Sequence, residues 1–72
     1  MKKIKKIKIK INGKKILIDD KEKLSKILQD LKIPIKKVAI ELNREIIVKK
    51  KLNSIKVKEH DVVEIVHFIG GG

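Results

Sequence analysis

The chain has 72 residues with no cysteine, tryptophan or tyrosine, and its formal net charge at pH 7 is +11. A domain of this length buries only about 60% of the surface that its unfolded chain exposes, so aliphatic packing must stabilise it. Fifteen isoleucines, six leucines and six valines are available, and the β-branched majority favours strands. Without cysteines, and with two histidines, the composition predicts neither a disulfide framework nor a metal site.

The positive charge raises the question of a nucleic-acid partner. Arg44 is the only arginine, and lysine cannot make the bidentate phosphate and base contacts of a guanidinium group. The single aromatic residue, Phe68, offers little surface for stacking bases. We therefore expect a lysine-covered solvent face and do not favour nucleic acid as a partner. A small basic nucleic-acid-binding module remains the alternative from a different class of function.

No stretch of the sequence suggests a membrane partner. No segment approaches the roughly 20 consecutive apolar residues that span a bilayer. At the N-terminus isoleucines alternate with lysines and form no continuous apolar stretch, so no signal peptide is predicted. A cytoplasmic protein is the default expectation.

The first predicted element is a β-hairpin. From Lys5 to Ile11 isoleucines alternate with lysines, the period-two pattern of a strand covered on one face. Asn12-Gly13 follows, and it is a strong signal for a two-residue hairpin turn because both residues tolerate positive φ. The returning strand is expected over Lys14 to Ile18.

After Asp19-Asp20 the periodicity becomes helical. Apolar residues at spacings i, i+3, i+4 and i+7 predict one amphipathic helix with these four facing the core: Leu24, Ile27, Leu28 and Leu31. Asp19 or Asp20 is expected to cap its start, with Glu22 completing a capping-box-like pair. Pro34, the only proline, predicts that the helix ends by about Lys32.

Three more strands are predicted in the second half of the chain, over residues 38–43, 46–48 and 62–68. A tight turn at residues 43–45 joins the first two. A polar loop over residues 49–58 should be held to the core by three apolar anchors, Leu52, Ile55 and Val57. The resulting order, ββ-α-ββ-β, predicts an α+β fold with a helix on one face of a mixed sheet.

Few side chains could serve catalysis. Ser25 and Ser54 are the only hydroxyl nucleophiles, and neither lies in a nucleophile elbow. No third group is evident that would orient His60 or His67 as a base. We therefore predict no catalytic residues, and we do not expect the chain to be an enzyme.

The C-terminal sequence Gly70-Gly71-Gly72 is the strongest functional signal. Alone it would be interpreted as a frayed chain end. However, it follows the last predicted strand directly, after the apolar pair Phe68-Ile69. Glycine has no Cβ, so such a tail can extend through a narrow slot, and its carboxylate is open to activation. A protein needs such an end if its own C-terminus is the substrate, in which case Gly72 would present the reacting carboxylate and Gly70 and Gly71 would supply reach.

Two stretches, VAIELNREII at residues 38–47 and DVVEIVHFIGGG at residues 61–72, are the most specific in the sequence. They resemble the VA-x-E-x-N-x-E-I-V segment and the D-x-V-E-I-V-x-F-V-G-G-G ending of the thiamine-biosynthesis sulfur carriers, the ThiS family. The related molybdopterin-synthase small subunits typically have a P-P-V stretch that is absent here. The chain differs from the family at three positions: Val48 for a usual proline, Leu52 for a frequent aromatic residue and His60 for a turn glycine.

The resemblance implies a β-grasp (ubiquitin-like) domain over residues 1–69, with a mixed four- to five-stranded sheet, and a flexible glycine tail over residues 70–72. An adenylating enzyme of the ubiquitin-activating type would use ATP to convert the Gly72 carboxylate to an acyl-adenylate. Sulfur drawn from cysteine by a desulfurase would then give a thiocarboxylate, which thiazole synthase would use to form the thiazole ring of thiamine. The chain itself would bind no cofactor. A carrier for molybdopterin or another thiolated product is the alternative.

Alternation along the last strand also predicts a docking surface. If Val63 and Ile65 face the core, the residues between and after them face the other way. Apolar side chains on a lysine-covered face often mark an interaction site. The residues expected to dock partner enzymes are Glu64, Val66, Phe68 and Ile69. The alternative is that the helix or an oligomer covers them.

Overall fold

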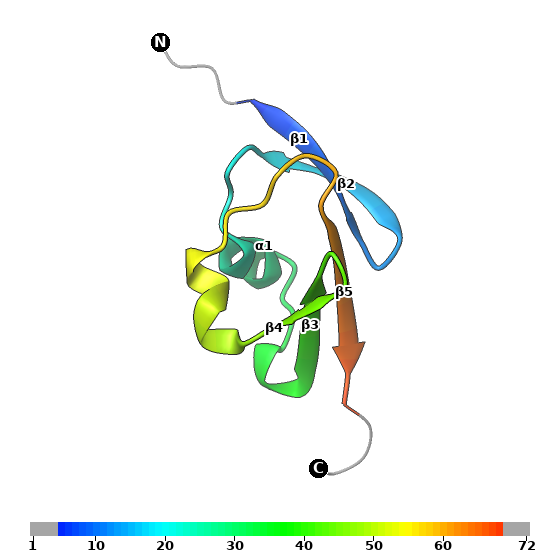
Figure 1. Cartoon of the computed structure of the whole chain (residues 1–72), viewed down its shortest axis with the longest axis vertical. Helices are drawn as coiled ribbons and strands as arrows, with labels where there is room; N and C mark the ends of the chain where they lie inside the picture. The colour runs from blue at the N-terminus through cyan, green and yellow to red at the C-terminus, as the bar shows by residue number, and fades with distance from the viewer. Residues whose placement is uncertain (1–4, 69–72) are drawn as a thin grey trace.

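The structure, a computed structural model, describes residues 5–68. A five-stranded mixed sheet carries one α-helix on one face (Figure 1). The strands are β1 (Lys6–Ile11), β2 (Lys14–Asp19), β3 (Val38–Leu42), β4 (Glu45–Ile47) and β5 (Val62–His67). The helix is α1 (Leu24–Asp30), and two 3₁₀ helices are η1 (Ile35–Lys37) and η2 (Lys49–Ser54). The predicted α+β fold is confirmed, with the sheet at the upper predicted size.

The last strand in the sequence lies in the middle of the sheet. The strand order is β2-β1-β5-β3-β4, in which β1 and β5 run parallel and every other neighbouring pair runs antiparallel. The two hairpins, β1–β2 and β3–β4, therefore flank β5 from opposite sides. This topology supports the chain on both sides shortly before its C-terminal segment.

Both hairpins turn through two residues in the left-handed region. Asn12 and Gly13 have φ of 49° and 84°, and Asn43 and Arg44 have φ of 51° and 73°. Two successive positive φ angles are typical of the type I′ turn, whose twist matches that of the flanking strands. The Asn12-Gly13 turn is thus confirmed. His60 also has a positive φ, 71°, a conformation that glycine adopts more readily than other residues.

The core lies between α1 and the inner face of the sheet. Its buried apolar residues come from α1, from η2 and the chain after it, and from every strand except the edge strands β2 and β4: Ile7, Ile9, Ile11, Leu24, Ile27, Leu28, Val38, Ile40, Leu52, Val57, Val63 and Ile65. Leu52 and Val57 are buried and Ile55 is half-buried, so the three predicted loop anchors do contact the core. The loop itself contains a helical segment, η2, that the sequence pattern did not indicate.

The predicted aspartate cap of the helix is wrong. The residue that caps α1 is Lys23, and its side chain makes no capping hydrogen bond. Instead the Leu24 N–H donates to the carbonyl of Ile55 at 2.8 Å, in a short bridge between the chain before α1 and the chain after η2. Because a backbone carbonyl satisfies the first helical donor, no side-chain cap is needed there.

The two aspartates that were expected to cap the helix make other contacts. Asp19 ends β2, where its carboxylate pairs with Lys6 at 2.6 Å across the β1–β2 ladder. The N–H of Asp20 donates to the Lys5 carbonyl at 2.8 Å and extends the same ladder. Glu22, the predicted capping-box partner, lies in the turn that follows, where its N–H donates to the Asp19 carbonyl at 3.2 Å.

The helix ends as predicted, but one residue of its apolar stripe does not reach the core. Lys32 adopts φ of 60°, and the N–H of Ile33 donates to the Leu28 carbonyl at 3.0 Å, which is the pattern of a Schellman motif. Leu31, just before this turn, is 43% exposed. Its expected burial is therefore wrong, because α1 has ended and the sheet's edge lies beside it. No helix in the described residues is long and apolar enough to span a bilayer.

Candidate functional site

The predicted reacting end lies beyond what the structure describes. Gly70, Gly71 and Gly72, and with them the predicted docking residue Ile69, fall outside residues 5–68. The described part of the site is therefore β5, the strand that leads to the tail, and the surface around it.

Strand β5 is held differently on its two sides. On one side β3 pairs with it from Leu42↔Val63 to Val38↔His67, and the Phe68 N–H donates to the Lys37 carbonyl at 3.0 Å. On the other side β1 pairs only with the first two residues of β5. The rest of β5 extends beyond the β1–β2 hairpin, towards the C-terminal segment (Figure 1).

An asparagine side chain continues the support where β1 stops. The Ile65 N–H donates to Asn12 Oδ1 at 2.7 Å, and Asn12 Nδ2 lies 3.4 Å from the Ile65 carbonyl oxygen. The Asn12 amide therefore takes the position that the next peptide group of β1 would have had. It anchors the middle of β5 to the hairpin turn.

A second asparagine anchors the start of β5. Asn43 Oδ1 accepts the Val62 N–H at 2.9 Å, and Asn43 Nδ2 donates to Asp61 Oδ1 at 3.0 Å. The other oxygen of Asp61, which is 6% exposed, accepts the Lys58 N–H at 2.8 Å. Buried carboxylates are costly unless they are hydrogen-bonded in this way. Sequence reasoning missed these anchors, although Asn43 and Asp61 belong to the two stretches that resemble the ThiS family.

The predicted facing of β5 is confirmed. Val63 and Ile65 are buried, whereas Glu64 is exposed, Val66 is 51% exposed and Phe68 is 59% exposed. Since α1 packs on the other face of the sheet, the helix does not cover them, and coverage by an oligomer stays the alternative.

Two apolar residues from the neighbouring hairpin belong to the same surface. Ile46 is 72% exposed and Val48 is 52% exposed. The register places Ile46 beside Glu41, which in turn lies beside Glu64 of β5, so Ile46 shares the outer face. We call the exposed apolar residues at the β3–β4–β5 end of this face the outer patch: Ile46, Val48, Val66 and Phe68. Leu17 on β2 is also exposed on this face, but β1 separates it from β5.

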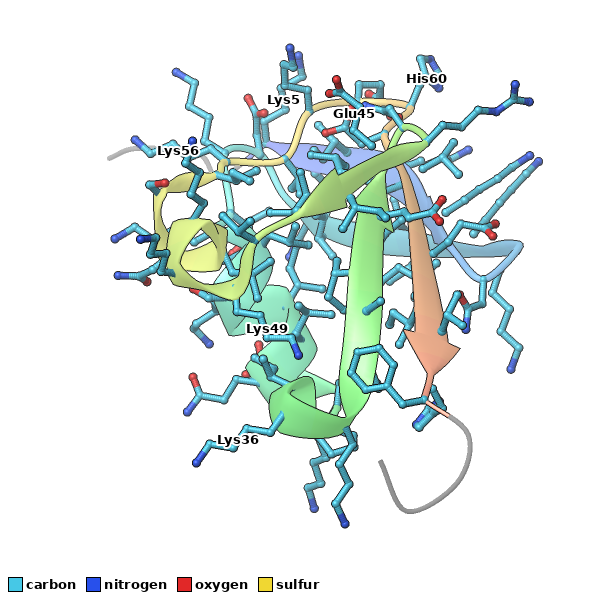
Figure 2. All side chains as sticks on the ribbon, turned by 60° about the horizontal axis from the view of Figure 1, so that its bottom comes forward. Lys5, Lys36, Glu45, Lys49, Lys56 and His60 are labelled. Atoms are coloured by element: carbon cyan, nitrogen blue, oxygen red, sulfur yellow. The ribbon has the colours of Figure 1, made fainter. Side chains whose placement is uncertain are left out.

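A lysine lies across this patch. The Lys49 ammonium, next in sequence to Val48, is 5.3 Å from the centroid of the Phe68 ring (Figure 2). This cation–π contact links the chain after β4 with the end of β5. Sequence reasoning missed Ile46 and Val48. The available signal was the run Ile46-Ile47-Val48, because a strand with one buried face cannot bury three consecutive side chains.

The other polar side chains of residues 5–68 lie apart from one another or make structural hydrogen bonds. Lys5, Lys36 and Lys56 project from different sides of the domain (Figure 2). Residues 5–68 contain no group of three or more His, Cys, Asp or Glu side chains that could hold a metal ion. Ser25 Oγ donates to Asn53 Oδ1 and Ser54 Oγ donates to the Lys51 carbonyl, so both hydroxyls have structural hydrogen bonds.

A lysine on the helix has a raised pKa. The pKa of Lys26 on α1 is raised above 10.5, first by its hydrogen bond to Asp30 and then by the charge of that carboxylate. This pair joins exposed side chains on the helix surface, remote from β5. It therefore has no part in the chemistry of the tail.

The helix on a mixed sheet, the central last strand and the C-terminal glycines together define a ubiquitin-like β-grasp domain. The crystal structure of the thiamine biosynthesis protein ThiS from Geobacter metallireducens has the same fold: TM-score 0.76, 30% identity, and coverage of 92% of this chain and 100% of that one. Residues 4–72 match the model of the ThiS family. The chain therefore belongs to the ThiS family.

Curated relatives agree with this assignment. The sulfur carrier protein ThiS of Bacillus subtilis (strain 168) is 35% identical over 65 residues, covering 89% of this chain and 98% of that protein. The prediction of a carrier and not an enzyme is confirmed by this kinship.

Two longer relatives match with the same part of the chain. The thiazole synthases of Magnetococcus marinus and Paramagnetospirillum magneticum are 33% and 36% identical over 66 residues. The match covers 92% of this chain but only 20% of each synthase. A segment like this whole domain is thus part of those two longer proteins.

Proposed function

We propose that this protein carries sulfur for the thiazole ring of thiamine on the carboxylate of Gly72. The observation that carries the proposal is the ThiS-family match, which extends through Gly72, together with a carrier of almost equal length as a relative. The tail sequence agrees with it, because three glycines place no side chain beside the carboxylate.

The proposed chemistry explains why the chain needs no catalytic side chain. A carboxylate resists substitution because its oxygen is a poor leaving group. Adenylation by an ATP-dependent partner of the ubiquitin-activating type would attach AMP to that oxygen. The persulfide sulfur of a cysteine desulfurase would then attack the carbonyl carbon, and the C–O bond to AMP would break to give an acyl disulfide. A second thiol, such as that of free cysteine, would attack the sulfur that belongs to the desulfurase and would be oxidised to a disulfide, so that the S–S bond breaks and the thiocarboxylate is released. Every catalyst in this sequence belongs to a partner.

The role of the folded domain would be to position the strand that leads to the reacting carboxylate. Asn12 and Asn43 hold β5 at its middle and its start, so the chain leaves the sheet in a fixed direction. A partner bound to the outer patch would then hold the strand that leads directly to the tail. We propose that Val66 and Phe68 are central to this contact, with Ile46 and Val48 around them and Glu64 at its edge. We also propose that Ile69, which lies outside the described residues, takes part in docking.

If both partner enzymes use the outer patch and act on the Gly72 carboxylate, they must bind one after the other. We propose that the adenylating enzyme and thiazole synthase both dock on the outer patch. Two proteins named thiazole synthase contain a segment like this domain, and domains that act on each other are often joined in one chain. Because adenylation uses ATP, we place the cycle in the cytoplasm.

Intact-mass measurement tests the carrier proposal. The protein is incubated with ATP, an adenylating enzyme of this class, a desulfurase and cysteine. We expect a gain of roughly 16 Da, oxygen exchanged for sulfur, confined to the C-terminal peptide. The chain without Gly72 must show no gain. A full-length chain that stays unmodified while the B. subtilis carrier is modified in parallel would refute the proposal.

A matched pair of variants tests the docking surface in the same assay. Val66→Asp should slow thiocarboxylate formation at least about tenfold, because a buried unpaired charge is costly at an interface. Leu17→Asp also replaces an exposed aliphatic side chain with a carboxylate, but on β2, away from β5; Leu17 is 62% exposed. This variant should leave the rate unchanged at low micromolar concentration. Equal rates for the two variants would remove the outer patch from the proposal.

A further inference from the structure

The two edges of the sheet are protected unequally. The edge strand β4 has three residues, whereas the edge strand β2 has six and pairs with β1 without a bulge. Natural proteins protect long edges with proline, bulges, covering elements or charge. Strand β2 has neither proline nor bulge, and no element of the described chain pairs with its outer edge. Its protection is charge, with Lys14 and Lys15 at one end and Asp19 at the other, and charges of opposite sign can also pair with a second strand.

The backbone direction along β2 is set by its turn. In a two-residue hairpin Lys14 bonds to β1, and the Asp20 N–H donates to the Lys5 carbonyl at 2.8 Å. Alternation therefore directs the N–H and C=O groups of the three odd-numbered residues, Lys15, Leu17 and Asp19, away from β1. Of these, only the Asp19 carbonyl accepts a local bond, from Glu22 at 3.2 Å.

The sequence of this edge is self-complementary. Residues 14–20 read KKILIDD, with two lysines before and two aspartates after the central Ile-Leu-Ile. In an antiparallel pair of two such strands centred on Leu17, Lys15 lies opposite Asp19 and Leu17 lies opposite Leu17. The lysine end of each strand then faces the aspartate end of the other.

We propose that β2 pairs with β2 of a second copy of this chain, antiparallel and about a two-fold axis at Leu17. The two five-stranded sheets then form one continuous sheet. The outward backbone groups match, since Leu17 faces Leu17 and Lys15 faces Asp19 as hydrogen-bonding pairs. Opposite charges directly across a ladder stabilise it, whereas like charges destabilise it.

The side chains around this edge fit the same partner. On the inner face Ile16 and Ile18 are half-buried, and with the 43%-exposed Leu31 they line a hollow of about 290 Å³ between β2 and α1. A second copy brings its own Ile16 and Ile18 to this hollow. This contact would cover Leu31, the one residue of the helix stripe that the monomer leaves exposed.

On the outer face the second copy supplies a missing anion. Lys15 lies opposite Lys10 within the monomer, a pair of like charges. Asp19 of the second copy would lie on the other side of Lys15 and offset that repulsion. Strand β1 separates β2 from β5, so this contact leaves the outer patch uncovered and does not depend on the proposed function.

Sedimentation with charge-swapped variants tests the pairing. At about 0.15 M salt, repulsion between two chains of charge +11 is largely screened beyond roughly 8 Å. We expect wild type to form a dimer that dissociates on dilution. Lys15→Glu and Asp19→Lys should each self-associate at least about tenfold more weakly, because each places like charges opposite each other twice. Lys36→Glu has the charge of the first variant and should dimerise at least as well as wild type.

Mixing the two charge-swapped variants is the decisive experiment. An equimolar mixture of Lys15→Glu and Asp19→Lys should form a heterodimer within about threefold of wild-type strength. The introduced glutamate of one chain then faces the introduced lysine of the other, and the native Asp19 of the first chain faces the native Lys15 of the second. A wild type that stays monomeric up to about 1 mM would overturn the proposal. Two single variants that each dimerise as strongly as wild type would also overturn it, and so would a mixture that associates no more strongly than either variant alone.

A cysteine at the axis provides a second readout that does not depend on charge. The chain has no cysteine, and facing residues of a hydrogen-bonded antiparallel pair have Cα atoms about 5.5 Å apart, within disulfide reach. Leu17→Cys should therefore form a disulfide-linked dimer at least about tenfold faster than Lys36→Cys under mild oxidation. Equal rates would refute a two-fold axis at Leu17.

Discussion

Replacing Asn12 tests whether its side chain anchors β5. Asn12→Gly removes the 2.7 Å bond from the Ile65 N–H and the long 3.4 Å contact to the Ile65 carbonyl, while glycine keeps the positive φ of 49° accessible. The loss of one effective hydrogen bond at a part-buried amide, with the added freedom of the unfolded chain, should cost about 1–2 kcal/mol. Asn12→Ala should cost about 1 kcal/mol more, because alanine is strained in the left-handed region.

Thermal unfolding measures the loss of global stability, and amide exchange measures the loss of protection at β5. The melting temperature should fall by about 4–8 °C for each kcal/mol lost. Exchange at the Ile65 amide should accelerate more than exchange at the Asn43 amide, which bonds to the Val62 carbonyl at 2.7 Å on the other side of β5. Unchanged stability in Asn12→Gly, or equal acceleration at both amides, would refute the assigned anchor.

Three further predictions concern the core, the patch and the helix. Leu28→Ala should lower the free energy of unfolding by about 2–5 kcal/mol in urea titrations, because Leu28 has no exposed surface. Val66→Asp should lower it by no more than about 1 kcal/mol, since Val66 is 51% exposed; a larger loss would mean that the side chain supports the fold. Because the pKa of Lys26 is raised in the folded protein, its pair with Asp30 stabilises the fold below pH 10.5, and this stabilisation is lost as the pH rises through the pKa of Lys26 in the folded state. Asp30→Asn should therefore lower the midpoint of the Lys26 titration measured by NMR.

The elements that local periodicity defines could be predicted from the sequence. The isoleucine–lysine alternation and Asn12-Gly13 defined the first hairpin, and alternation around Val63 and Ile65 gave the outward facing of Val66 and Phe68. These predictions succeed because side-chain direction in a strand depends only on position along it.

The features that sequence reasoning missed depend on residues far apart in the chain. The first donor of α1 bonds to Ile55, so the expected aspartate cap had no role. The Asn12 anchor requires that β1 and β5 be neighbours, which no local pattern encodes. Leu31 shows the related limit that a helical stripe indicates a face, while the extent of the opposing sheet decides burial.

Transfer of labelled sulfur tests the central claim most directly. The protein is prepared with a heavy sulfur isotope as the thiocarboxylate at Gly72 and is given to thiazole synthase with its other substrates. The account predicts that the isotope appears in the thiazole product and that the protein returns to its unmodified mass. A labelled carrier that keeps its sulfur while thiazole forms from another source would contradict it.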